Sequence, residues 1–282
     1  MNHPLVDSHI HFWHPNQLQY DWLAEVPAIN RPFLPADLAE QAAGIDLQKI
    51  VFVQCDCITA HSLREVEWVT SLAGDEPRIQ AIVAFAPLEK GAAASDHLET
   101  LSAYPLVKGV RRLIQSEGAG FCIQPDFVQG VQLLAGFGYS FDLCLLHHQL
   151  PDAIKLVEQC PQVSFVLDHL GKPAIKAGQL DPWRQDLKSL AAFPNVTCKI
   201  SGAVTEADLA QWTPADLQPY LDHTIEVFGP DRVMYGGDWP VSLLATTYQT
   251  WLETLDAATA GLSAVEKEKL FYHNACAFYK LL

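Results

Sequence analysis

The chain has 282 residues, of which 49% are hydrophobic and 18% are charged, so it can bury a large core as one barrel-sized domain or as two smaller domains. Its 18 basic residues against 33 acidic residues give a formal net charge of -15, which repels phosphate backbones and anionic lipid surfaces. We therefore expect neither a nucleic acid nor a membrane as its partner.

The apolar runs, the opening residues and the cysteines together indicate a reducing compartment. No run of eighteen apolar residues is present, and the opening MNHPLVDSH lacks the basic-then-apolar pattern of a secretory signal, so a cytoplasmic location is expected. Cys55, Cys144 and Cys198 lie inside apolar runs, where a thiol behaves as a small hydrophobic group. We expect the seven cysteines to be reduced and structural.

The first strand-like run covers residues 5–12 and carries Asp7, His9 and His11 in alternation. Successive side chains of a strand point to opposite faces, so these three are predicted to share one face. A histidine pair at this spacing also arises by chance, and partly exposed histidines at a strand end are the alternative interpretation.

Seven further strand-like runs follow in chain order. They are largely apolar and cover residues 49–55, 79–85, 106–114, 139–146, 163–170, 196–202 and 232–239. Stretches with helical spacing lie between them, such as 63–74, 126–138, 151–160, 181–193 and 216–229, and several begin with Pro or Asp and end with Gly.

Eight strand–helix units in a chain of this length predict a closed (β/α)8 barrel, with residues 1–282 forming a single domain. An open doubly wound sheet is the alternative, but no glycine-rich phosphate turn follows the first strand. The stretch 13–35 is rich in Pro, Trp and Tyr, and we expect it to fold over the barrel mouth.

Polar residues gather where the predicted strands end, which is where barrels place their active sites. The ends of five runs carry His9 and His11, Arg111 and Arg112, His147 and His148, Asp168 and His169, and Asp238. Each has a structural alternative, such as a turn aspartate, a core histidine or an ion pair. Lys199, in the run 196–202, could likewise be a surface or ion-pair residue. Their coincidence at one end of one barrel predicts a metal or acid–base site.

Several motifs together are similar to those of the amidohydrolase superfamily, and within it to the lactonase branch. They are HIHFW, VKGVRRLIQ, FDLCLLHHQL, FVLDHLGKP, CKISG, YGGDWPV and the closing NACAFY, so the likeness runs from Val6 to about Tyr279. The resemblance implies a barrel that opens sugar-derived or related lactones with water.

Carried over residue by residue, the resemblance assigns His9 and His11 to strand one, His169 to strand six and Asp238 to strand eight. His147 matches the strand-five histidine better than its neighbour His148 does. The family often has Ser before the strand-eight aspartate, whereas this chain has Gly237.

The superfamily usually binds one or two divalent ions, but this branch is similar to lactonases that need none. Lys108 lies too early in strand four to bridge two metals after carbamylation. We therefore expect at most one ion, Zn²⁺, held by His9, His11 and Asp238, or else a metal-independent site in which the histidines bind the substrate directly.

Lactone hydrolysis needs a base, a group that stabilises the oxyanion and an acid for the leaving alkoxide. Asp238 is the candidate base and acid, and His169 and Arg111 are the candidates that polarise the carbonyl. The candidates for substrate contacts are His147, Trp13, Trp22, Trp239, Lys172 and Glu65.

Two alternatives stay open at this stage. One is a different reaction at the same site, namely lactone isomerisation, decarboxylation or amide hydrolysis, and the other is a catalytically silent binding barrel. An intact Asp238 argues against the silent barrel. The sequence leaves open which lactone is used and whether the chain forms a homo-oligomer.

Overall fold

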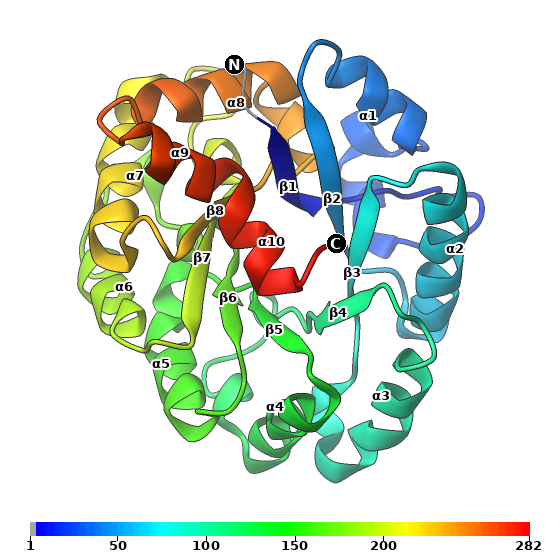
Figure 1. Ribbon diagram of the computed structural model, residues 1–282. Helices are drawn as coiled ribbons and strands as arrows, with labels where there is room; N and C mark the ends of the chain where they lie inside the picture. The colour runs from blue at the N-terminus through cyan, green and yellow to red at the C-terminus, as the bar shows by residue number, and fades with distance from the viewer. Residues whose placement is uncertain (1–3) are drawn as a thin grey trace.

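The computed structural model describes residues 4–282 and places eight parallel strands in one sheet, in the order in which they occur in the chain. The strands form the ring seen in Figure 1. They are β1 (Leu5–Ile10), β2 (Leu47–Val53), β3 (Ile79–Ala84), β4 (Val107–Val110), β5 (Ser140–Leu143), β6 (Phe165–Leu167), β7 (Val196–Ile200) and β8 (Val233–Tyr235).

The ring closes between β1 and the residues that follow β8. The Asp238 backbone N–H donates to the His9 carbonyl at 2.8 Å, and the His11 N–H donates to the Trp239 carbonyl at 2.8 Å. A parallel bridge joins Ile10 to Trp239 between these two bonds. The predicted single-domain (β/α)8 barrel is confirmed.

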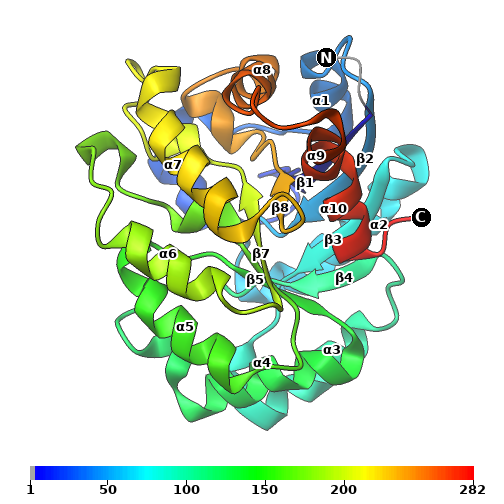
Figure 2. The same cartoon turned by 60° about the vertical axis from the view of Figure 1, so that its left-hand side comes forward.

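Helices surround the barrel and pack on the outer faces of the strands; α5, α6 and α7 are seen outside β5, β7 and β8 in Figure 2. The helices are α1 (Pro35–Gln41), α2 (Ser62–Asp75), α3 (Ser95–Leu101), α4 (Pro125–Phe137), α5 (Leu150–Gln159), α6 (Trp183–Ala191), α7 (Pro214–Phe228), α8 (Tyr248–Ala258), α9 (Ala264–Glu268) and α10 (Asn274–Tyr279). No helix among these described residues is long and apolar enough to cross a membrane.

Local sequence signals fix several helix ends. Pro125 occupies the first position of α4, and Gly138 ends that helix with a φ of 71°, which a residue without a side chain adopts readily. Thr213 precedes α7, and its N–H and hydroxyl both bond the Asp216 carboxylate, at 2.7 and 2.8 Å. These two bonds tie the residue before the helix to its first turn.

Several strands end earlier than predicted, because the chain leaves the ladder as soon as the polar residues begin. β6 stops at Leu167 and β8 at Tyr235, and both His169 (φ 55°) and Asp238 (φ 51°) then adopt left-handed backbone conformations. Such turns cannot continue a strand. They carry the polar side chains away from the sheet and toward the barrel axis.

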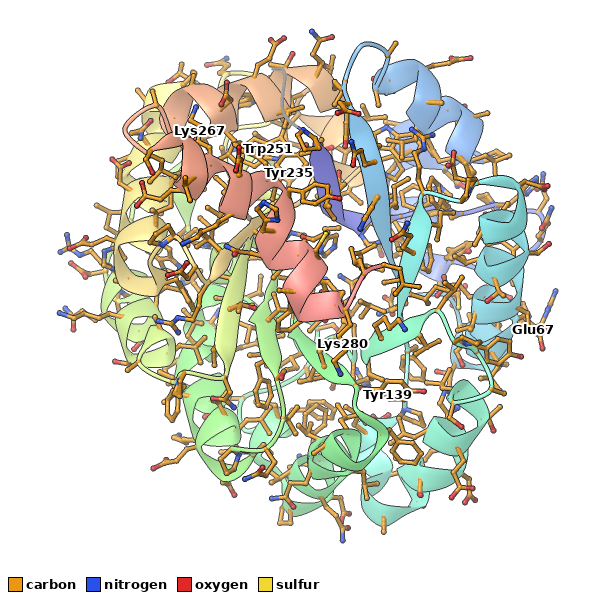
Figure 3. All side chains as sticks on the ribbon, in the orientation of Figure 1. Glu67, Tyr139, Tyr235, Trp251, Lys267 and Lys280 are labelled. Carbon is orange, nitrogen blue, oxygen red and sulfur yellow. The ribbon has the colours of Figure 1, made fainter. Side chains whose placement is uncertain are left out.

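The amino-terminal end of the barrel is closed by α10, which crosses the opening in the ring of strands in Figure 1. Tyr279 of this helix is buried, and its hydroxyl donates to Asp142 Oδ2 of β5 at 3.0 Å inside the barrel. Lys280 follows at the helix end, as Figure 3 shows. Any ligand of the barrel interior therefore has to enter from the opposite, carboxyl end.

Candidate active site

A cavity of about 210 Å³ lies at the carboxyl ends of the strands. Two of its wall residues, Trp13 and Trp22, come from the stretch 13–35, which is held closed by a backbone pair between Trp13 and Phe33. Seven of the residues predicted for the site line this cavity: His11, Trp13, Trp22, Arg111, His169, Lys172 and Asp238.

Asp238 faces three imidazoles. Its Oδ1 lies 3.5 Å from His11 Nε2, 3.8 Å from His9 Nε2 and 3.9 Å from His169 Nε2. All four side chains are at least nine-tenths buried. Predicted residues from three distant parts of the chain thus converge on one point.

The second nitrogen of two of these rings has its own partner. His11 Nδ1 lies 2.7 Å from the Val53 carbonyl, and His169 Nδ1 lies 2.9 Å from Ser201 Oγ. A carbonyl accepts only, so Nδ1 of His11 carries the proton and its Nε2 presents a lone pair to the cavity. Such outer contacts fix the orientation of a ring.

Burial keeps the imidazoles neutral at physiological pH. It lowers the pKa of His169 to about 4, because the imidazolium loses its hydration, and it also lowers the pKa of His11. Burial alone would raise the pKa of Asp238, but His169, His11 and His9 outweigh it and hold that pKa below its ordinary value. Asp238 is therefore an ionised carboxylate among neutral rings.

Below this group lies a buried set of charged side chains. Asp168 Oδ2 accepts a hydrogen bond from Arg111 Nη1 at 3.3 Å, and Asp168 Oδ1 lies 3.1 Å from Lys199 Nζ and 3.3 Å from His9 Nδ1. Lys199 in turn contacts Asp142. Two carboxylates and two cations balance one another here, so this set leaves the Asp238 charge uncompensated.

Two groups of three side chains could hold a metal ion within the described residues: His9 with His11 and Asp238, and His9 with Asp168 and His169. The second is already neutralised, because Asp168 faces two cations. The first offers imidazole lone pairs and a free carboxylate. Ligands around a tetrahedral zinc lie about 3.4 Å apart, close to the 3.5 and 3.8 Å that separate Asp238 Oδ1 from His11 and His9. This first group fits a divalent ion.

Gly202, after β7, makes room for the contact between Asp238 and His169. A Cβ atom at Gly202 would lie 2.5 Å from His169 Nδ1 and 3.0 Å from Asp238 Oδ2, and the residue has a φ of 59°. Both the space and the backbone conformation therefore require glycine at this position.

Gly237 makes room for a second contact, behind the site. Asp7 accepts hydrogen bonds from the backbone N–H groups of His9 and Gly237, each at 2.9 Å, and from the Tyr248 hydroxyl at 2.8 Å. The Tyr248 ring lies where a side chain at position 237 would be. Position 237 is therefore packed against both Asp7 and the Tyr248 ring of α8.

We expect Gly237→Ser to lower the free energy of unfolding by about 1–3 kcal/mol, because its Cβ would overpack a filled core. That atom would lie 2.4 Å from Asp7 Oδ2 and 2.7 Å from Tyr248 Cε2. Urea unfolding measures the change. Gly136→Ser is the matched control, since a Cβ there meets nothing within 4 Å. Equal stability of the two variants would contradict the prediction.

Other sequence-predicted residues lie elsewhere. His147 follows β5 in a half-exposed 3-10 turn (His147–Gln149), and the structure does not bring it to the cavity wall; Cys144 lines the wall instead. Trp239 is fully buried between Phe12 and Phe33 and likewise does not reach the cavity.

Two more interpretations are settled by contacts. Glu65 does not stand at the rim: it is buried on α2, where its Oε1 accepts the Cys55 N–H at 3.2 Å. Arg112 is an ion-pair residue, 3.1 Å from Glu89 and 2.7 Å from Glu117. The sequence placed Glu65 on a helix and Arg112 at the end of a strand, but such positions do not show which neighbour a long side chain contacts.

The sequence assigned no role to Asp142, indicated Asp168 only as one of the polar strand-end residues, and left the role of Lys199 open. Their signal was a charged residue inside an otherwise apolar strand, as in FDLCLL and TCKISG. Asp56, Gln115 and Thr205 also line the cavity. They lie in loops, where no periodicity indicates the direction of a side chain.

The chain is also similar to known proteins. The amidohydrolase family matches residues 6–281. An L-fucono-1,5-lactonase of Burkholderia multivorans is 33% identical over 98% of this chain and 96% of its own length, and an L-rhamnono-gamma-lactonase of Scheffersomyces stipitis is 23% identical over 98% of both.

A crystal structure of an amidohydrolase from Burkholderia multivorans with bound zinc superposes with a TM-score of 0.89 at 32% identity, over 99% of this chain and 100% of that one. The resemblance predicted from the strand-end motifs is confirmed by a family match that spans nearly the whole barrel. The chain therefore belongs to the amidohydrolase family.

Proposed function

We propose that this chain hydrolyses a sugar-derived lactone, with Asp238 as the general base. The observation that carries the proposal is the buried Asp238 carboxylate, whose Oδ1 lies 3.5 to 3.9 Å from three imidazoles at the wall of a cavity. The similarity to lactonases that act on fuconolactone and rhamnonolactone supports the substrate class.

In this mechanism Asp238 takes a proton from water while the water oxygen bonds to the lactone carbonyl carbon. The tetrahedral intermediate then breaks the bond between that carbon and the ring oxygen. Asp238 returns its proton to the leaving alkoxide, so the products are a hydroxyl group and a carboxylic acid that ionises in water. The carboxylate of Asp238 is regenerated.

Arg111 is the candidate donor for the oxyanion. Its guanidinium lines the cavity, and its Nε is buried with no hydrogen-bond partner among the described residues. A substrate carbonyl oxygen at this wall would lie near the guanidinium, and the charge assistance would strengthen as the oxyanion forms.

His9, His11 and Asp238 are the residues that would hold one divalent ion, and we propose Zn²⁺. When bound, such an ion polarises a carbonyl and acidifies bound water. His9 receives its orientation from Asp168 and His11 from Val53, so both rings keep their positions for either metal or substrate.

The charges of the wall favour a neutral substrate. The wall carries the carboxylates of Asp56 and Asp238, which repel a substrate carboxylate. Its two cations already have carboxylate neighbours, because Lys172 lies 3.7 Å from Glu206 and Arg111 lies beside Asp168. Asp56, Gln115 and Thr205 can bond hydroxyl groups, and the rings of Trp13 and Trp22 can cover C–H faces. The volume of about 210 Å³ suits one small ring.

The test is a panel of five- and six-membered aldono-lactones, followed by a pH indicator that detects the released acid. We expect turnover of at least one neutral, hydroxylated lactone and much weaker turnover of lactones that carry a carboxylate. Amide, isomerisation and decarboxylation substrates belong in the same panel. Turnover of one of those, with none of the lactones hydrolysed, would overturn the proposal.

A further inference from the structure

Asp56, which follows β2, differs from the other charged residues of the cavity wall. Arg111 and Lys172 each lie beside a carboxylate, and Asp238 faces imidazoles. Within residues 4–282, by contrast, the Asp56 carboxylate accepts no hydrogen bond and has no cation within 4.0 Å. Its two oxygens are therefore available to a ligand in the cavity.

The backbone of Asp56 is held in a conformation that is rare for a residue with a side chain. Its φ is 55°, in the left-handed region, and its N–H donates to Gln54 Oε1 at 2.6 Å. Gln54 is buried, and its carbonyl accepts a hydrogen bond from Arg111 Nη2. One residue thus positions both the candidate oxyanion donor and the free carboxylate. Conformations of this kind gather at ligand sites, where the surrounding structure maintains them.

The order of the strands fixes the sides of the mouth on which these groups stand. Asp238 follows β8 and Arg111 follows β4, and these two strands are opposite each other in the ring of eight. Asp56 follows β2 and Lys172 follows β6, which are opposite each other across the other diameter. In the proposed reaction the lactone carbonyl lies between Asp238 and Arg111. Ring substituents then point to the sides, and one of these sides is lined by Asp56.

Trp22 supplies an apolar surface to the same wall and is tied to the residue before Asp56. Its Nε1–H donates to the Cys55 carbonyl at 2.9 Å, so the polar edge of the indole is already used. The ring can cover C–H groups, while the two carboxylate oxygens can accept hydrogen bonds from two neighbouring hydroxyl groups. An apolar and a polar surface on one wall match the two kinds of group that a hydroxylated ring presents.

We propose that Asp56 determines the substrate specificity of the cavity: it binds two adjacent hydroxyl groups of a neutral lactone and repels lactones that carry a carboxylate. The inference rests on the proposed function, because it takes the carbonyl to lie between Asp238 and Arg111. Asp56 has no part in the proton transfers. Its effect is therefore on binding and on the choice between substrates.

The test compares the wild type with Asp56→Asn and Asp56→Gly, because Asn and Gly both adopt a positive φ readily. Three lactones of one ring size are used: one with two adjacent hydroxyl groups, its analogue that lacks one of them, and one that carries a carboxylate. Asp21→Asn is the matched control. Asp21 is an exposed aspartate whose charge acts on Asp56, but it does not line the cavity.

We expect Asp56→Gly to lower kcat/KM for the hydroxylated lactone about tenfold, which is a typical loss for a hydrogen bond to a charged group. Asp56→Asn keeps one acceptor oxygen and should lose less. For the carboxylated lactone, kcat/KM should rise about threefold in both variants, because a repulsive charge is removed. A general distortion of the site would lower all three values together, so changes in opposite directions identify a specificity residue.

A second measurement does not use hydrolysis. Calorimetry follows the binding of an anhydroalditol, which is a hydroxylated ring without a carbonyl. Weaker binding by folded Asp56→Gly supports the assignment even if no lactone is hydrolysed, and in that case only the proposed reaction fails. If lactones are hydrolysed but their selectivity changes less than about twofold in folded Asp56→Gly, or changes equally in Asp21→Asn, the assignment is overturned and the proposed reaction stands. Failure of the anhydroalditol to bind the wild type also overturns it.

Discussion

Asp238→Asn should lower lactone turnover at least ~100-fold, because the amide keeps the size of the side chain and removes the general base, which is typically worth ~10² to 10⁴ in rate. The three imidazoles around Asp238 Oδ1 would then face a neutral group. Initial rates at saturating lactone, measured near neutral pH, give the change in kcat.

Two controls separate catalysis from folding. Circular dichroism and the Tm show whether the variant keeps the barrel. Asp56→Asn removes another carboxylate from the wall of the same cavity, and we expect it to change KM more than kcat, since Asp56 has no imidazole partner. If a folded Asp238→Asn protein has a kcat within about threefold of the wild type, Asp238 is a structural turn residue and not the general base.

Asp168→Asn should lower the free energy of unfolding by about 3–5 kcal/mol, which is the cost of breaking a buried ion pair by removing one partner. The change leaves the Arg111 guanidinium without its carboxylate and takes one of two carboxylates from Lys199. Urea unfolding followed by fluorescence gives the difference. The same variant should also lose activity, because His9 loses the group that faces its Nδ1.

Asp181→Asn is the matched control for this prediction. Asp181 pairs with Arg184 at 2.9 Å, but both side chains are nearly half exposed, so water screens the pair. We expect a loss of no more than about 1 kcal/mol. If Asp168→Asn costs as little as the surface variant, the buried charges do not hold the site together in the way that their distances indicate.

The order and number of the strands could be predicted from the sequence, because their cause is local. A parallel strand covered on both faces is apolar along its length, and the runs around Val51, Val166 and Met234 show this directly. The polar residues that follow the strands could be predicted for the same reason, as at His11 and Asp238, although the strands themselves stop earlier than the apolar runs indicate. In a barrel all such ends meet at one mouth.

The direction of individual side chains could not be predicted in this way. A register irregularity between Asp7 and Ile10 breaks the simple alternation in β1. Asp7 consequently bonds the backbone of Gly237 behind the site, while His9 and His11 reach Asp238. His147 and Trp239 also followed strand runs in the sequence, yet a turn carries one to the surface and packing takes the other into the core.

The sequence by itself therefore determined the barrel, its mouth and the group formed by His9, His11, His169 and Asp238, since local periodicity and strand ends carry that information. Only the tertiary structure decided what lies beneath them. Lys199 meets His9 across 190 positions of the chain and Asp142 across 57. Charge compensation in a buried interior depends on distances of a few ångströms between side chains, and no spacing along the chain encodes them.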